Sequence, residues 1–581
     1  MPSMAANSLT KSATAFNWKI AGQAGEGVMV SAKLLAKAVM RHGWQAFNYL
    51  EYPSLIKGGH QTGQVYAAAK QAYCQYRRLD LLIIFHQQGF VEHQDEIDAR
   101  TIVFYNSDLI DESILKKYPQ FKAKLYPLPF FSLAKQAASQ QIAANVVALG
   151  ASAYVLGLKR KVLSKLIKEE FQAKGQKIIK ANLAALQIGH DAAAAQLSPL
   201  FKVTSKQTKQ LLLNGNEAVA LGAIAAGVQY FSGYPMTPTS SLMHYLAAAQ
   251  QHYPLVVKHT EDEIAGINQA LGAAYAGVRA MTATSGGGFA LMVEGLSLAG
   301  VTELPIVIAY GMRQGPATGL PTWTSQADLQ FVLRAGHGEF QRVVLTPGTI
   351  QEHFELTQQA FVLAEKFQIP VFILSDKYAL ESHQTMAQPQ LSYALKRYAM
   401  VKEQDLPKDD SYRRYKLTRS GVSPRSVPGQ AHGLQVTNSY DHDEFGFATE
   451  DAQLTKQQID KRQRKLKGIA QAIPQPVLLG PKKAPVTLVS WGSTTNVILE
   501  LLTKTKKVNA IHLPCVWPFP SKQFQQLAQK AQKLVMIEGN ATGQAQQLIR
   551  QQTGLVIKDS VRRYDGRPFY VNDLIKELKL K

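Results

Sequence analysis

The chain has 581 residues, of which 46% are hydrophobic and 18% are charged. This balance is typical of a folded globular protein and excludes a disordered chain. The length exceeds what one hydrophobic core supports, so several domains are expected. The two cysteines, Cys74 and Cys515, exclude a disulfide framework. They also cannot ligate an iron–sulfur cluster alone, because a cluster takes about four ligands.

No stretch reaches the ~18 uninterrupted apolar residues of a membrane span, and the N-terminus lacks the apolar core of a signal peptide. We therefore expect a cytoplasmic protein with no membrane partner. The formal net charge is +22, and the basic residues concentrate in residues 158–180 and 456–468. The favoured interpretation is two solvated helix faces, followed by docking of an acidic protein. Nucleic acid ranks third and is not expected as a partner, because no recognised binding motif accompanies the charge.

The first elements predict an α/β domain at residues 17–195, after a flexible tail at residues 1–16. A strand, a Gly-rich turn and a helix come first, and short strand-like runs such as "LDLLIIF" and "RTIVFYN" then alternate with helical patterns. This alternation is typical of a layered domain with a largely parallel, Rossmann-like sheet. Residues 196–208 are interpreted as a linker.

The turn "GQAGEG" contains Gly22, Gly25 and Gly27 between the first strand and helix, where backbone N–H groups can hold a phosphate. It departs from the dinucleotide fingerprint because Ala24 takes the second glycine position. A tight structural turn is the favoured interpretation, and a nucleotide or phosphate ligand is the alternative. A second loop, with Lys57, Gly58, Gly59 and His60, could face the same crevice.

A second α/β unit is predicted at residues 209–394, an irregular connecting segment at 395–484, and a third α/β unit at 485–581. In the second unit, "GYPMTPTSS" follows a strand, and its hydroxyls and N–H groups at a helix start suit an anionic ligand or simple capping. "TSGGG" precedes a helix of small residues, and consecutive glycines let a ligand approach the backbone. Arg313 ends the strand "PIVIAYG", where it can hold a carboxylate or form a surface salt bridge.

Glu263 lies at the start of the helix "EIAGINQALGAAYAG", which has small residues on every face. Close packing of such a helix would partly desolvate the carboxylate. Capping alone would explain one acid there, but not its coincidence with three loops suited to a ligand. Glu263 is therefore a candidate for sharing a proton with a bound heterocycle, and Glu261 is the weaker candidate.

Four of these segments, at residues 233–241, 261–277, 284–295 and 315–322, resemble the motif series of the 2-oxoacid:ferredoxin oxidoreductase alpha subunit. "GQAGEGV" and "YPSLIKGGH" resemble the gamma domain of that family, here fused ahead of alpha. "GVSPRSVPG", "VSWGST", "WPFP" and "MIEGNATGQ" resemble its later parts. The resemblance covers nearly the whole chain and implies a gamma domain, a pyrimidine-type thiamine-diphosphate domain and a transketolase-C-like domain.

The resemblance also implies roles for individual residues. Glu263 is similar to the glutamate that hydrogen-bonds the aminopyrimidine ring of thiamine diphosphate and favours its imino tautomer. Thr237 and Arg313 are similar to the ligands of the substrate carboxylate. The remaining residues implied to contact the cofactor are Tyr234, Pro235, Ser285 and Gly286. The chain has Gly287 where the family usually has proline, which would loosen the loop.

The chain lacks the Gly-Asp-Gly motif that holds the metal and diphosphate of thiamine enzymes. The family therefore implies a beta subunit that brings Mg²⁺, the diphosphate site and a [4Fe–4S] cluster, with no metal ligands in this chain. It implies assembly as a dimer of alpha–beta pairs. The expected reaction is the oxidative decarboxylation of a 2-oxoacid, with 2-oxoglutarate preferred over pyruvate, coenzyme A as acyl acceptor and ferredoxin or flavodoxin as electron acceptor.

Two other enzyme classes remain as alternatives. A self-sufficient thiamine-diphosphate decarboxylase or transferase would be active without a partner. An NAD-dependent dehydrogenase would use the N-terminal glycine loop.

Overall fold

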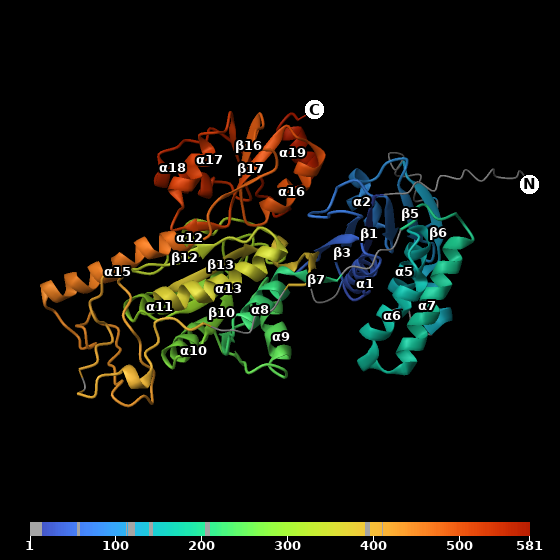
Figure 1. Ribbon diagram of the computed structural model, residues 1–581. Coiled ribbons are helices and arrows are strands. Elements are labelled where there is room, and N and C mark those ends of the chain that lie inside the picture. The colour runs from blue at the N-terminus through green and yellow to red at the C-terminus, as the bar shows by residue number, and fades with distance from the viewer. Residues whose placement is uncertain are drawn as a thin grey trace, which may run out of the picture. The chain divides into compact units, whose positions relative to one another are not determined.

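The computed structural model describes residues 14–54, 58–111, 113, 122–138, 143–203, 209–389, 396–409 and 411–580. Most of the expected N-terminal tail, Lys57 of the second glycine loop and residues 204–208 of the expected linker lie outside these ranges. The chain divides into two compact units. The first comprises residues 1–213, 382–388 and 570–573, and the second comprises the remaining residues. Figure 1 shows the elements of both units.

The first unit is built on an eight-stranded sheet with the order β6-β5-β4-β1-β3-β2-β14-β7. In that order, the strands span Lys124–Leu128, Ile102–Asn106, Leu81–Ile84, Ala15–Gln23, His60–Ala68, Gln45–Glu51, His383–Ala387 and Gln210–Asn214.

The prediction of a largely parallel sheet in the first unit is wrong for half of it. Strands β1, β4, β5 and β6 pair in parallel, but β3 pairs antiparallel with both β1 and β2, and β14 pairs antiparallel with β2. The segment between β2 and β3 is too short for the crossover helix that a parallel pair requires. The short connection therefore accounts for the antiparallel pairing of β2 with β3.

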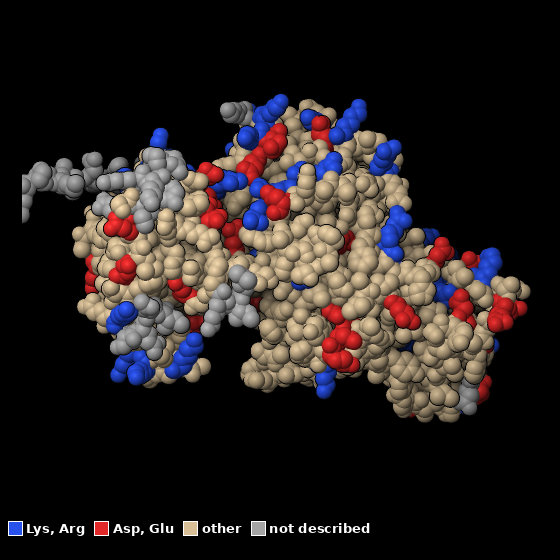
Figure 2. All heavy atoms as spheres, turned by 180° about the vertical axis from the view of Figure 1, so that it is seen from behind, with Lys and Arg blue, Asp and Glu red and all other residues tan. Residues whose placement is uncertain are grey.

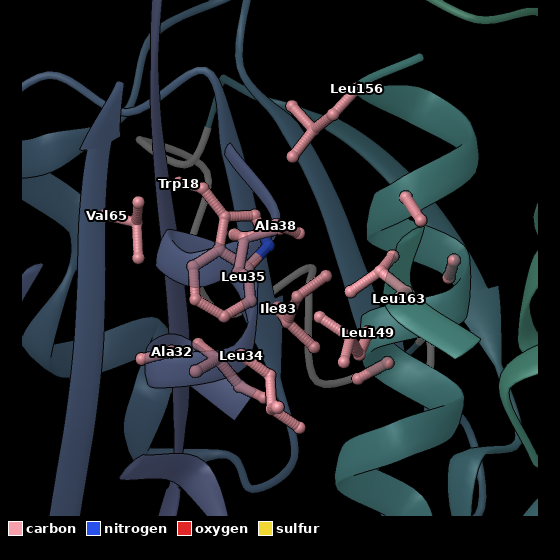
Figure 3. Close-up of a cluster of buried hydrophobic side chains, with 14 of the residues drawn as sticks. Trp18, Ala32, Leu34, Leu35, Ala38, Val65, Ile83, Leu149, Leu156 and Leu163 are labelled. Atoms are coloured by element: carbon pink, nitrogen blue, oxygen red, sulfur yellow. The ribbon is translucent and has the colours of Figure 1, made fainter. Parts of the chain in front are cut away.

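Helices pack against this sheet, including its antiparallel half, and their apolar side chains form the core. Figure 3 shows Trp18 of β1 and Leu35 of α1 lying toward Leu149 of α5 and Leu163 of α6. Trp18 is fully buried, and its indole N–H donates to Ser152 Oγ at 2.8 Å, which satisfies its only polar group. The helices are α1 (Val28–Arg41), α2 (Gln88–Glu92), α4 (Phe130–Ala138), α5 (Ala144–Val155), α6 (Arg160–Glu170) and α7 (Gln176–Ala194).

The second unit contains a seven-stranded sheet with the order β18-β12-β13-β11-β10-β8-β9. All its pairings are parallel except that between β12 and β18. In sheet order, the strands span Cys515–Trp517, Val343–Leu345, Pro370–Asp376, Ile306–Met312, Ala280–Thr284, Tyr230–Gly233 and Val256–His259. The helices of this layer are α8 (Gly215–Ala225), α9 (Ser240–Ala249), α10 (Glu263–Tyr275), α11 (Gly286–Val301), α12 (Leu329–Arg334), α13 (Ile350–Phe367) and α14 (Lys377–Glu381).

The C-terminal part of the second unit forms a five-stranded sheet with the order β15-β17-β16-β19-β20. Its strands span Val477–Leu479, Val508–Leu513, Val486–Trp491, Leu534–Glu538 and Asp559–Arg562. The later helices are α15 (Ala452–Ala472), α16 (Thr494–Lys504), α17 (Ser521–Ala528), α18 (Gln544–Thr553) and α19 (Val571–Glu577).

Four strands lie away from the domains that the sequence suggested for them. β7 and β14, within the expected 209–394 domain, complete the sheet of the first unit. β15 lies in the expected connecting segment, before residue 485, but joins the C-terminal sheet. β18 lies in the expected third unit, after residue 485, but joins the seven-stranded sheet. Strand pairing between segments far apart in sequence leaves no local signal, and the expected boundaries otherwise stay a prediction.

The described residues of 396–476 contain little regular structure apart from α15 and a short turn of helix at Glu403–Asp405. Buried charges attach this segment to the second unit. The Glu303 carboxylate forms ion pairs with the ammonium groups of Lys461 and Lys465, each at an N···O distance of 2.5 Å. All three side chains are essentially inaccessible to solvent. Arg425 donates to the carbonyl of Ala274.

The interpretation of both basic stretches as solvated faces is therefore wrong for the second, because Lys461, Arg462 and Lys465 of α15 are buried. The first stretch is exposed along α6 and the start of α7. Figure 2 shows lysine and arginine side chains gathered at that end of the first unit.

The α/β, multidomain fold class that the sequence predicted is confirmed by these sheets and their covering helices. Among the described residues, no helix combines the length and the apolar character needed to cross a bilayer.

Candidate active site

Most of the predicted site residues of the second unit lie at one edge of the seven-stranded sheet. β9, β8, β10 and β11 are neighbouring parallel strands, so the loops after them emerge together at their carboxyl ends. Those loops carry Glu263, Thr237, Ser285 and Arg313, respectively. This edge is where open α/β sheets bind ligands.

Glu263 is the first residue of α10, and only 4% of its surface is exposed. The preceding Asp262 caps the helix by accepting a hydrogen bond from the Ala265 backbone N–H at 2.8 Å. Capping is thus performed by Asp262, which leaves Glu263 free of that task. The Oε1 atom of Glu263 is buried and has no hydrogen-bond partner. A buried polar atom without a partner is costly, and such atoms point to an absent ligand or a catalytic role.

The first turn of α11 lies directly against Glu263. A Cβ atom added at Gly288 would lie 2.4 Å from Glu263 Oε1 and 2.2 Å from Thr284 Oγ1. Only glycine therefore leaves room for the carboxylate at this point. Ser285, the residue before α11, is fully buried, and its Oγ has no partner. Gly286 is the first residue of α11. Gly287 is exposed, and a Cβ atom at Gly287 would meet nothing within 4 Å.

Arg313 and Thr237 are brought together by a direct hydrogen bond. Nη1 of Arg313 donates to the backbone carbonyl of Thr237 at 2.9 Å. Both residues are partly buried, and burial lowers the pKa of Arg313, although the guanidinium remains charged at neutral pH. The carbonyl bond uses one of five guanidinium donors, and two parallel donors suffice to hold a carboxylate.

Tyr234 and Pro235 follow β8 directly and lie at the same sheet edge. Tyr234 is 39% exposed, and its ring centroid is 6.0 Å from that of His259 at the end of β9. Pro235 is partly buried. The exposed ring of Tyr234 can cover a planar ligand at this edge.

Sequence reasoning missed two residues of the site, Tyr310 and Asp328. The hydroxyl of Tyr310 donates to Asp328 Oδ2 at 3.0 Å. A Cβ atom at Gly286 would lie 3.3 Å from both of these oxygens, so the pair packs against the start of α11. The available signal was that Asp328 is the only acid in the otherwise uncharged stretch after Arg313.

The loop that joins Arg313 to Asp328 is held by the C-terminal sheet, which the sequence also did not reveal. Gln326 exchanges hydrogen bonds with Gly539: its N–H donates to the Gly539 carbonyl, and its Oε1 accepts from the Gly539 N–H, both at 2.8 Å. Its Nε2 donates to the carbonyl of Trp491 at 2.9 Å. The motifs "VSWGST" and "MIEGNATGQ" thus contribute to the site by fixing this loop.

The first glycine loop belongs to the first unit and has a structural explanation. Glu26 lies inside the loop: its Oε2 accepts from the Gln23 N–H, and its Oε1 lies 2.7 Å from His86 Nε2. A Cβ atom at Gly22 would come within 2.7 Å of that carboxylate, while Gly25 and Gly27 have φ of 100° and 75°. The loop's own acid thus takes one backbone N–H that a phosphate could otherwise bind. A phosphate role for Gly22, Gly25 and Gly27 stays a prediction.

These residues suit one face of a cofactor with a nitrogen heterocycle. The unpartnered Glu263 Oε1 can share a proton with a ring nitrogen, and the Ser285 hydroxyl is available beside it. No group of three or more His, Cys, Asp and Glu side chains that could hold a metal ion occurs among the described residues. Together, the fold and these residues define an α/β protein with a buried, unpartnered carboxylate and a partly buried arginine at the ligand-binding edge of its sheet.

Comparisons with known proteins identify the family. Residues 221–461 match the family described as pyruvate flavodoxin/ferredoxin oxidoreductase, thiamine diP-bdg (thiamine-diphosphate-binding), and residues 17–192 match pyruvate ferredoxin/flavodoxin oxidoreductase. The chain is 32% identical to the 2-oxoacid:ferredoxin oxidoreductase subunit alpha of Sulfolobus sp, over 97% of this chain and 96% of that protein. It is 30% identical to the 2-oxoglutarate synthase subunit KorA of Methanothermobacter thermautotrophicus, over 57% of this chain and 88% of that protein.

A solved structure, the 2-oxoglutarate:ferredoxin oxidoreductase from Magnetococcus marinus with 2-oxoglutarate, coenzyme A and succinyl-CoA bound, matches 98% of this chain and 99% of its own. The sequence identity is 29% and the TM-score 0.89. The chain therefore belongs to the 2-oxoacid:ferredoxin oxidoreductase family, as an alpha subunit preceded by a gamma-like domain. The resemblance seen in the sequence is confirmed. The family assignment argues against the alternative of a nicotinamide dehydrogenase.

Proposed function

We propose that this chain, together with a beta subunit, oxidises 2-oxoglutarate. In the proposed reaction, 2-oxoglutarate, coenzyme A and two oxidised ferredoxins give succinyl-CoA, carbon dioxide, two reduced ferredoxins and a proton. Two observations support this substrate: one relative is named a 2-oxoglutarate synthase subunit, and the matched solved structure holds 2-oxoglutarate and succinyl-CoA. A flavodoxin could replace ferredoxin, since both carry single electrons.

The observation that carries the proposal is the buried, unpartnered Oε1 of Glu263 against Gly288. Bound thiamine diphosphate supplies the carbon nucleophile and the electron sink for decarboxylation. Glu263 holds a proton between its Oε1 and a nitrogen of the pyrimidine ring, and so sets the tautomer of that ring. A positioned proton-sharing group of this kind contributes about 10²–10⁴-fold in rate.

The remaining residues at this sheet edge bind and orient. Ser285 and Gly286 line the cofactor loop, and Tyr234 and Pro235 cover the ring from the loop after β8. The proposal is supported by the unpartnered Ser285 hydroxyl and by the position of all four residues at one sheet edge.

Thr237 and Arg313 hold the carboxylate next to the keto group of the substrate. Their hydrogen bond fixes the guanidinium beside the Thr237 loop and leaves its other donors for the carboxylate. Orienting the bond that will break is worth far more than simple binding, because it converts a free encounter into a fixed geometry.

The beta subunit supplies what this chain does not contain: Mg²⁺ with its diphosphate site, and a [4Fe–4S] cluster. The 581 residues include no Gly-Asp-Gly motif and only two cysteines, both buried. A groove of about 540 Å³ runs beside α10 and α11, and its lining includes Ile264 and Leu291, which are about half exposed. Apolar side chains exposed beside Glu263 support docking of the partner there, in a dimer of alpha–beta pairs.

Purified complex tests the proposal directly. The chain is co-expressed with its beta subunit and assayed with coenzyme A and a viologen acceptor, comparing 2-oxoglutarate with pyruvate. We expect kcat/KM to favour 2-oxoglutarate, and no turnover from this chain alone with thiamine diphosphate and Mg²⁺. Turnover by the isolated chain would instead indicate a self-sufficient thiamine enzyme.

A further inference from the structure

A small cavity lies inside the second unit, where the loop after Arg313 meets the C-terminal sheet. Its walls include residues 324–326, the start of α16 and the segment that carries Arg563 and Arg567. Its volume is about 20 Å³, which is the space of one or two water molecules. A ring does not fit into such a space, so the occupant is either water or one small polar group.

Three hydrogen-bond donors without an acceptor line this cavity. Ser325 is only 4% exposed, and its hydroxyl makes no hydrogen bond to any residue that the structure describes. Thr494 is the first residue of α16, which has no side-chain cap, and its backbone N–H has no acceptor in the described part of the chain. The third donor is the guanidinium of Arg567. Such a group of donors requires an acceptor.

The charge of Arg567 is not neutralised by a neighbouring acid. Its guanidinium carbon lies 3.2 Å from the centre of the Trp323 ring, and it forms no ion pair with a described residue. Stacking on a ring leaves the N–H edge of a guanidinium able to donate. Arg563, by contrast, is paired with Asp565 at 3.1 Å. Since no acid is among the described residues that line the cavity, Arg567 gives it a positive charge.

Hydrogen bonds fix the segments that carry these donors. The Thr324 N–H donates to the Gly566 carbonyl at 3.1 Å, which joins the first and last segments of the wall. The Thr324 hydroxyl donates to Asp376 Oδ1 at 3.0 Å, and Asp376 itself does not line the cavity. Gln326 is held by Gly539 through two hydrogen bonds. The donors are therefore placed before any ligand binds, which lowers the cost of binding.

We propose that this cavity binds a single oxyanion group, a carboxylate or a phosphate, between Arg567, Ser325 and the N-terminus of α16. The Arg567 guanidinium and the Thr494 N–H only donate, and the Ser325 hydroxyl donates to an anion, so all three match an acceptor with negative charge. The helix dipole of α16 adds to this attraction. Glu263 and Arg313 do not line the cavity, so the inference does not depend on the proposed reaction.

Calorimetric titration of the full chain tests this site with two probes, inorganic phosphate and acetate. Sodium chloride keeps the ionic strength constant, and the buffer contains no other oxyanion. We expect saturable binding of at least one probe and a melting temperature that rises with its concentration. Arg567→Gln, which removes the charge, should weaken binding by about tenfold, and Ser325→Ala by about threefold. Tighter binding of phosphate would identify a phosphate site, and tighter binding of acetate a carboxylate site.

A matched control separates this site from nonspecific attraction to a basic protein. Arg419 is an exposed arginine of the same unit that does not line the cavity, so Arg419→Gln should leave the dissociation constant within about twofold. Melting temperatures without a probe, compared for all variants, show whether each one folds. The inference is overturned if neither probe binds saturably, if Arg567→Gln binds as tightly as the unmodified chain, or if Arg419→Gln loses as much affinity as Arg567→Gln.

Discussion

Replacing Gly288 by alanine should damage catalysis far more than folding. The added Cβ would lie 2.2 Å from Thr284 Oγ1, 2.4 Å from Glu263 Oε1 and 2.7 Å from Glu263 Cδ, closer than real Cβ contacts allow. The atoms contacted belong to side chains and not to the backbone, so the overpacking cost is about 1–3 kcal/mol and the fold survives. The Glu263 carboxylate, however, must shift by roughly 1 Å, and such a misplacement costs about 100-fold in rate.

Gly287→Ala is the matched control for this prediction. It makes the same change one residue earlier in the same helical turn, where a Cβ atom meets nothing within 4 Å. Exchanging glycine for alanine in a helix stabilises the helix by up to about 1 kcal/mol. Thermal unfolding, thiamine diphosphate titration and kcat of the complex would be measured for both variants. Equal activities for the two would refute the claim that Gly288 makes room for the carboxylate.

Three further predictions concern stability. Lys461→Met should lower the free energy of unfolding by about 3–5 kcal/mol, because it removes one of the cations that compensate the buried charge of Glu303. The control is Lys456→Met, at a side chain that is 76% exposed, which should change the free energy of unfolding by less than about 0.5 kcal/mol. Burial lowers the pKa of His60 from 6.5 to about 4, so its contribution to stability is present above pH 6.5 and is lost as the pH falls toward 4. His60→Gln should therefore flatten the stability profile in that window by up to about 3 kcal/mol, and an unchanged profile in chemical denaturation would contradict this. Gly287→Pro should raise the melting temperature, since the position is exposed in the first turn of α11, and a lower one would show that the exchange is not tolerated there.

The sequence predicted the parts of the site that depend on local order along the chain. Each of the loops after β8, β10 and β11 follows its own strand, so Thr237, Ser285 and Arg313 could be assigned to one sheet edge. Glu263 stood out because a carboxylate opened a helix of small residues. The family resemblance then supplied the cofactor that this carboxylate is proposed to serve.

Contacts between segments that are distant in sequence could not be predicted. Asp328 accepts a hydrogen bond from Tyr310, and the loop between them is held by Gly539, more than 200 residues later. β14 joins the first sheet after a separation of more than 300 residues from its partner β2. The charge pattern of its own helix predicts Lys461 to be a solvated basic residue. Tertiary packing places it against Glu303 instead. In each case the decisive partner leaves no pattern near the residue in sequence.

The most direct test of the account is turnover of the complex with Glu263→Gln, measured with 2-oxoglutarate, coenzyme A and a viologen acceptor. Glu261→Gln serves as control, because it makes the same change two residues earlier at an exposed side chain. The account predicts that kcat falls by about 10²–10⁴-fold for Glu263→Gln, and stays near the unmodified value for Glu261→Gln. Unimpaired turnover in Glu263→Gln would contradict it.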